Sequence, residues 1–179
     1  DDQTHPCVDR LRGASPCPLL YRAATVPSAA GQRNTGIDMA KGDIVAFLDD
    51  DLSLEPDFLE KLMAPFEEDP GQAVGGVSGT LIHSNATEPR GLNRLLLGIV
   101  LGDFHGQLSG RVVGPAVNFM PLDIPDTVQR VDWLLSGAVA YRSSVLKRHR
   151  FGSEFTGYSF AEDLHLSSRV AKDWILLNT

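Results

Sequence analysis

Three consecutive carboxylates, Asp49, Asp50 and Asp51, directly follow a short apolar run at residues 44–48. The run is rich in β-branched and aromatic side chains, and it predicts a strand buried on both faces of a mostly parallel sheet. Ionised carboxylates are costly to bury without partners, so these three should face water or a cation at the strand end, where α/β sheets bind ligands. Asp49 and Asp51 could hold one Mg²⁺ together with substrate phosphates. A solvated acidic turn that opens the next helix is the alternative, and these residues alone leave both interpretations open.

A second acidic pair, Glu162 and Asp163, lies where we expect the first turn of a helix at residues 160–172, after an aromatic-bearing loop. Acidic residues in a first turn are ordinary partners of the helix dipole. If this helix end and the end of strand 44–48 share one cleft, however, the chain has a carboxylate cluster for a metal. It also has a separate carboxylate that can accept a proton, as general-base catalysis requires.

Arg33 is the third candidate, in the early turns of a helix predicted at residues 29–41. A guanidinium there could reach a nucleotide or diphosphate bound at the same strand ends, and a surface arginine is the alternative. The glycines fit neither a dinucleotide fingerprint nor a phosphate-binding loop, and the five histidines lack metal-binding spacing.

Composition narrows the class of protein. Sixteen Lys and Arg against twenty-three Asp and Glu give a net charge of −7, which argues against a broad nucleic-acid-binding surface. Cys7 and Cys17 lack both CxxC and zinc-ligand spacing, so we expect free thiols in a reducing compartment. The longest apolar stretch, residues 95–101, is too short for a membrane span, and no signal peptide opens the chain. The sequence therefore predicts a soluble, cytoplasmic protein.

The elements that must position these residues alternate between strand and helix over the first eighty residues, which indicates one α/β domain with a parallel core. Residues 1–18 are expected to be irregular, and residues 136–138 should lie in the middle of a strand. Ser28 is a plausible N-cap for the first helix. Helices are predicted at residues 29–41, 56–68, 92–101, 143–149 and 160–172, and strands at 19–26, 44–48, 73–83, 133–141 and 174–177. Because the chain starts without methionine and stops just after a strand-like run, we expect a fragment cut at both ends.

The ordered set of motifs resembles the family 2 glycosyltransferases with the GT-A fold. Residues 31–36 are similar to the family's ARNxG helix start, and residues 42–51 are similar to its strand and DxD motif. Residues 54–59 resemble the following helix, residues 136–142 resemble the segment near the acceptor pocket, and residues 162–170 resemble the ED motif and its helix. The resemblance covers roughly residues 27–178, with 85–130 unmatched. It implies a three-layer sandwich around a mostly parallel mixed sheet.

By this resemblance, Asp49 and Asp51 would hold Mg²⁺ or Mn²⁺ on the diphosphate of a nucleotide sugar. Arg33 and Asp50 would help to bind that donor, as would Asp2, which is similar to the acidic end of the family's second strand and would contact the base. The family's first strand is absent from this sequence. So is the region beyond its last strand, where a metal-binding histidine can lie.

Asp163 would be the catalytic base, which takes the proton of an acceptor hydroxyl as that oxygen attacks the anomeric carbon. A single displacement of this kind inverts the configuration. The acceptor would be a glycan, a lipid-linked molecule or another hydroxyl compound. The helix at 92–101 should face the core, and contact with the inner face of a membrane is its alternative role.

Two other functions fit part of the sequence. Residues 47–53 also satisfy the DxDx(S/T) pattern of haloacid-dehalogenase-like phosphatases, with Asp49 as nucleophile and Asp51 as acid. That family needs a later lysine followed by an acidic pair, whereas Lys147 has no acidic pair before Glu162. A carbohydrate-recognition domain without turnover is the other alternative, and the intact acidic residues argue against it.

Overall fold

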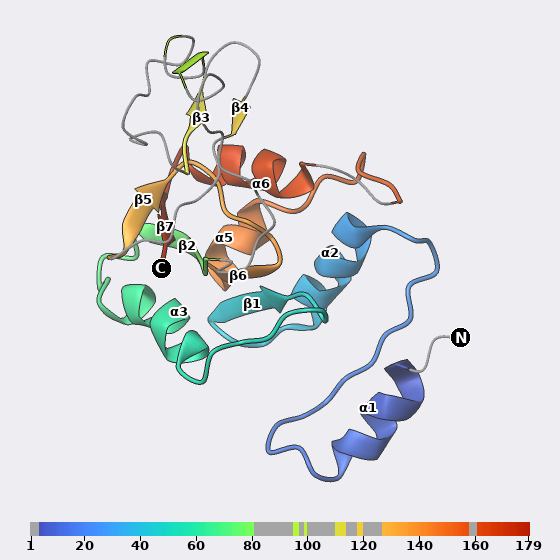
Figure 1. The fold of residues 1–179 in the computed structure, drawn as a ribbon. Coiled ribbons are helices and arrows are strands. Elements are labelled where there is room, and N and C mark those ends of the chain that lie inside the picture. Colours follow the sequence, from blue (N-terminus) through green and yellow to red (C-terminus); the bar gives the residue numbers. More distant parts are fainter. Residues whose placement is uncertain are drawn as a thin grey trace.

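A five-stranded sheet with the strand order β1-β6-β2-β7-β5 organises the molecule, as the computed structural model shows (Figure 1). The structure describes residues 4–80, 95–96, 99, 110–113, 118–119, 127–157 and 161–179. The strands of the sheet are β1 (Ile44–Leu48), β2 (Val74–Ser78), β5 (Gln129–Val131), β6 (Ala138–Arg142) and β7 (Ile175–Asn178), and a separate pair is formed by β3 (Val112–Val113) and β4 (Asn118–Phe119). The helices are α1 (Thr4–Arg12), α2 (Ala29–Met39), α3 (Phe58–Glu67), α5 (Ser143–Arg148) and α6 (Glu162–Val170).

The sheet is mixed, and its strand directions decide which chain segments meet at one edge. β6 is antiparallel to both β1 and β2, β2 is parallel to β7, and β5 is antiparallel to β7. Strands β1, β2 and β7 therefore run in one direction, so their carboxyl ends lie at the same edge as the start of β6. Leu48, the last residue of β1, pairs with Ala138, the first residue of β6.

Helices cover both faces of the sheet, which confirms the predicted three-layer α/β architecture with a mixed sheet. Among the described strands of this sheet, however, only the β2–β7 pairing is parallel, whereas the sequence predicts a mostly parallel sheet. Because side chains alternate along a strand, neighbouring residues of β6 enter different cores. Val139 and Tyr141 join a cluster with residues of α2, α5 and α6, whereas Ala140 packs in a second cluster with Leu62 and Phe66 of α3. Tyr141 is fully enclosed in the first cluster, and this burial raises the pKa of its hydroxyl.

The prediction of burial for β1 is wrong. Within the described residues β1 pairs with β6 alone, so it forms an edge of the sheet, and Ala46 and Leu48 are exposed. An apolar run predicts a strand, but its position in the sheet depends on a partner that comes ninety residues later in the chain. β6 also begins later than expected, at Ala138, so Ser136 and Gly137 form a turn before the strand.

The amino-terminal predictions are also wrong, because residues 4–12 form α1 and residues 19–26 form no strand. α1 buries none of its residues and carries local ion pairs, such as Arg12 with Asp9. It lies apart from the sheet (Figure 1). Among the described residues, no strand pairs with residues 19–26, and an isolated strand is marginal in water. Cys7 and Cys17 are free, as predicted, and both are exposed.

The helix predicted at residues 92–101 lies outside the described residues except for Leu95, Leu96 and Ile99, and so do residues 81–83 of the strand predicted at 73–83. Within the described part of the chain, no helix has the length and apolar character needed to cross a membrane.

Candidate active site

Asp49 occupies the end of β1, opposite the turn that precedes β6. Its N–H donates to the carbonyl oxygen of Gly137 at 2.8 Å, and its side chain is 48% exposed. A Cβ at position 137 would lie only 2.9 Å from Asp49 Oδ2. The absence of a side chain at Gly137 therefore gives the Asp49 carboxylate its room, while Asp50 and Asp51 follow in an exposed turn.

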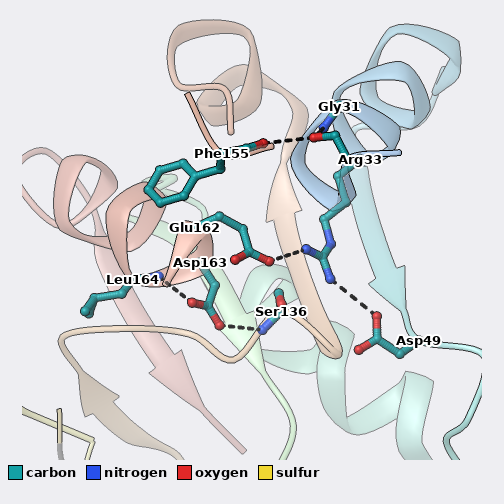
Figure 2. Close-up of polar contacts among 9 residues, drawn as sticks. Gly31, Arg33, Asp49, Ser136, Phe155, Glu162, Asp163 and Leu164 are labelled. Carbon is teal, nitrogen blue, oxygen red and sulfur yellow. Dashed lines mark hydrogen bonds and ion pairs between the residues drawn. The ribbon is translucent and has the colours of Figure 1, made fainter. Parts of the chain in front are cut away.

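Arg33 joins Asp49 to the second acidic pair (Figure 2). Its Nη1 donates to Glu162 Oε1 at 2.8 Å, and its Nη2 donates to Asp49 Oδ1 at 3.4 Å. The side chains of Arg33 and Glu162 are only 16% and 9% exposed, and the guanidinium carbon lies 5.5 Å from the centre of the Phe151 ring. The guanidinium is thus anchored at Glu162 and Phe151 and reaches Asp49 with Nη2.

Asp163 begins α6 beside Glu162 and is held by two backbone donors. The N–H of Leu164 donates to Oδ1 at 2.7 Å, and the N–H of Ser136 donates to Oδ2 at 3.4 Å (Figure 2). Burial raises the pKa of the Asp163 carboxyl, and the negative charge of Glu162 adds to the rise, against the opposing effect of the two N–H groups and Arg33. A carboxylate with a raised pKa is a stronger base than an exposed one.

The position of Asp163 follows from how α6 packs against the segment before β6. Ser167, one turn after Asp163, is fully buried and accepts a hydrogen bond from the N–H of Leu134 at 3.0 Å. Ser136 lies two residues after Leu134, so the segment that reaches Ser167 also brings the N–H of Ser136 to Asp163. Asp163 and Ser167 are four residues apart on one face of α6, and both accept hydrogen bonds from this segment.

The amino-terminal part of α2 is fastened to the loop before α6, which fixes the direction of Arg33. Ser28 is the N-cap, as predicted; its hydroxyl accepts from the N–H of Gly31 at 3.1 Å and donates to the carbonyl of Phe155 at 2.9 Å. Asn34 uses both ends of its amide on the backbone of Phe151, at 2.9 and 3.1 Å. Arg33 therefore points into the site, while Asn34, its neighbour on α2, anchors the helix to the backbone of Phe151.

The structure brings four acidic or basic side chains into one ring. On one side Arg33 links Asp49 to Glu162, and on the other the turn 136–137 links Asp49 to Asp163. Asp49, Arg33, Glu162 and Asp163 therefore lie close together, which is the arrangement that the sequence interpretation requires. The chemical roles assigned to these residues, and to Asp50 and Asp51, stay predictions. Asp2 lies outside the described residues.

Two features of the ring were missed from the sequence. Glu162 was interpreted only as a member of an acidic pair, but its nearly complete burial and its contact with Arg33 set it apart from Asp163. Gly137 was placed within a strand. A glutamate that is buried beside a candidate base needs a cationic partner. This requirement is the signal that could have paired Glu162 with Arg33.

Few side chains in the site could coordinate a divalent ion. Among the described residues, no three His, Cys, Asp or Glu side chains are grouped so that they could hold a metal. Mg²⁺ is commonly held by one or two carboxylates together with substrate phosphates, and it keeps several waters. Asp49 and Asp51, exposed at the end of one strand, fit an ion that binds together with a diphosphate better than an ion enclosed by protein ligands alone.

Comparisons with known proteins give a consistent result. The family model described as glycosyl transferase family 2 matches residues 2–109. A curated relative, glucosyl-dolichyl phosphate glucuronosyltransferase of Haloferax volcanii, is 44% identical over 45 residues, which are 25% of this chain and 14% of that protein.

Two solved structures share the fold. TarS 1-349 of S. aureus superposes with a TM-score of 0.61 at 16% identity, over 99% of this chain and 45% of that chain. Glucosyl-3-phosphoglycerate synthase of Mycobacterium tuberculosis, in complex with phosphoglyceric acid, has a TM-score of 0.54 at 18% identity, over 98% of this chain and 54% of that chain. The chain therefore spans about half the length of these two structures, and the likeness supports a GT-A-type fold.

Proposed function

Because the chain belongs to glycosyltransferase family 2, we propose that it carries the catalytic site for transfer of a sugar from a nucleotide-diphosphate donor to an acceptor hydroxyl, with inversion and with dependence on a divalent ion. The observation that carries this proposal is the ring in which Arg33 and the turn 136–137 join the Asp49 strand end to Asp163. A carboxylate for a metal and a carboxylate for a proton are thereby held in one place.

Asp163 is the base in this proposal. It accepts the proton of the acceptor hydroxyl while the oxygen forms its bond to the anomeric carbon, and the bond from that carbon to the diphosphate breaks on the opposite face. The two N–H groups fix the orientation of the Asp163 carboxylate, so less orientational entropy is lost when the reactive geometry forms.

Asp49 and Asp51 would hold Mg²⁺ or Mn²⁺. Arg33, Asp50 and Asp2 would contact the nucleotide-sugar donor. When bound, the ion would neutralise charge that develops on the leaving diphosphate. Arg33 supplies a fixed positive charge beside Asp49 at the same strand end.

The acceptor is proposed only by class. The mycobacterial neighbour was crystallised with phosphoglyceric acid, whereas the name of the archaeal relative specifies a glucosyl-dolichyl phosphate. These two compounds differ widely, so we propose a hydroxyl on a glycan, a lipid-linked molecule or another small compound. A cytoplasmic location at the inner face of a membrane stays a prediction.

The proposal is tested with Asp163→Asn in the full-length protein. Loss of a general base typically lowers the rate by about 10² to 10⁴, so transfer should nearly vanish while donor binding, measured by calorimetry, stays within a few fold of wild type. Asp173→Asn is the matched control, because Asp173 lies just after α6 in an exposed ion pair with Arg148. Transfer at the normal rate by Asp163→Asn would refute the assignment.

A thermal-shift screen of nucleoside diphosphates with and without Mn²⁺ identifies the donor class, because a ligand that binds only the folded state raises the melting temperature. Rapid hydrolysis of a generic phosphomonoester, without nucleotide binding, would instead support the phosphatase alternative.

A further inference from the structure

Asp49, the candidate metal ligand, already has a cationic partner in this structure. Arg33 Nη2 lies 3.4 Å from Asp49 Oδ1, while Nη1 of the same guanidinium lies 2.8 Å from Glu162 Oε1. The guanidinium is therefore shared between a carboxylate that belongs to the proposed metal site and one that does not.

The two contacts differ in strength. Arg33 and Glu162 are both mostly buried and their contact is short, so breaking it would leave a charge without a partner in a dry environment. The contact with Asp49 is longer, and the Asp49 side chain is about half exposed, so water and ions compete for it. Glu162 and the ring of Phe151 thus keep the guanidinium in place, and the Asp49 contact is the one that can be exchanged.

We propose that Arg33, held by the positioning residue Glu162, serves as the counter-ion of Asp49 while the donor is absent and contacts the donor's diphosphate when the donor and a divalent ion bind together. This inference rests on the proposed function. A cation at Asp49 and the guanidinium repel each other, so the ion alone binds weakly. An added diphosphate attracts both cations, so ion and nucleotide bind cooperatively.

Glu162 acts through Arg33 in this scheme and does not touch the substrate. With Glu162 present, the guanidinium has a second carboxylate and leaves Asp49 partly available. Without the Glu162 charge, Asp49 becomes the one carboxylate among the described residues that is within ion-pair distance of Arg33, and it is held more firmly. Removal of the arginine and removal of the glutamate should therefore change the affinity for a free ion in opposite directions.

The experiment measures the dissociation constant of Mn²⁺ alone, and of Mn²⁺ with saturating UDP, by calorimetry and electron paramagnetic resonance on the full-length protein. Arg33→Met should tighten binding of Mn²⁺ alone roughly three- to tenfold, because a unit positive charge 3.4 Å from Asp49 Oδ1 is removed. Glu162→Gln should weaken it by a similar factor. The gain in Mn²⁺ affinity that UDP provides should shrink about tenfold or more in Arg33→Met.

A double variant separates action through Arg33 from a simple change of local charge. If Glu162 acts through the guanidinium, Glu162→Gln has little effect on Mn²⁺ affinity once Arg33→Met is present. Arg12→Met and Glu55→Gln are the charge-matched controls, because both residues lie in exposed ion pairs outside the ring. If Arg33→Met does not fold, Arg33→Lys takes its place, since a single ammonium should stay with the buried Glu162 and free Asp49.

The outcomes are distinct. Opposite shifts in the two single variants, and their loss in the double variant, support the counter-ion exchange. Shifts no larger than those of the controls, or an equal effect of Glu162→Gln with and without Arg33, overturn it while the proposed function stands. A wild-type protein that binds neither Mn²⁺ nor any nucleoside diphosphate of the thermal-shift screen overturns the proposed function itself.

Discussion

Replacement of Gly137 by alanine tests whether the position of the Asp49 carboxylate controls activity. The added Cβ would lie 2.9 Å from Asp49 Oδ2 and 3.5 Å from its Cγ. Ordinary van der Waals contact begins near 3.4 Å, so the carboxylate must move by about 0.5 Å. The atom that must move is the end of a half-exposed side chain and not backbone, so the rest of the fold can accept the change.

The expected loss follows from the size of this shift. Misplacement by 1 Å at a reactive site can cost about 10²-fold in rate, so a shift of half that size should lower kcat/KM for transfer roughly tenfold. The free energy of unfolding should change by about 0.5 kcal/mol or less, as for other substitutions that create no buried defect.

Three measurements check this expectation: kcat/KM with the donor varied, the Mn²⁺ dissociation constant at saturating UDP, and urea denaturation. Gly13→Ala is the matched control, because its added Cβ would meet no atom within 4 Å. Full kcat/KM and unchanged Mn²⁺ affinity in a folded Gly137→Ala protein would refute the idea that this glycine sets the Asp49 carboxylate for the reaction.

Three further outcomes are expected. Because burial raises the pKa of Asp163 and the base must be ionised, transfer should decline as the pH falls through a value above the usual 3.8; a rate that holds down to that value would contradict the assignment of Asp163. Asn34→Ala removes both hydrogen bonds to the Phe151 backbone and should lower the free energy of unfolding by about 1–3 kcal/mol in urea denaturation, and an unchanged midpoint would show that this clamp contributes nothing. Gly36→Ala, in an open position on α2, should instead stabilise the protein by about 0.5–1 kcal/mol, and a lowered melting temperature would contradict this expectation.

Local chemistry explains what could be predicted from the sequence. The apolar run before Asp49 forms β1, Ser28 caps α2, and Glu162 and Asp163 begin α6, because these features depend on residues within a few positions of each other. The order of these features also identified the family. Predicted boundaries were displaced by a few residues where a turn adjoins a strand, as at Ser136 and Gly137, since the end of a ladder depends on the partner strand.

The amino-acid sequence by itself determined which elements form, which family the chain belongs to and which side chains are candidates for the reaction. Only the tertiary structure decided that β1 lies at an edge of the sheet, that β6 runs against it, and that Gly137 therefore meets Asp49. It also decided the pairing of Arg33 with Glu162, which are 129 residues apart. Periodicity and capping act over a few residues, whereas a buried ion pair forms only where packing brings two distant segments together and excludes water from both charges.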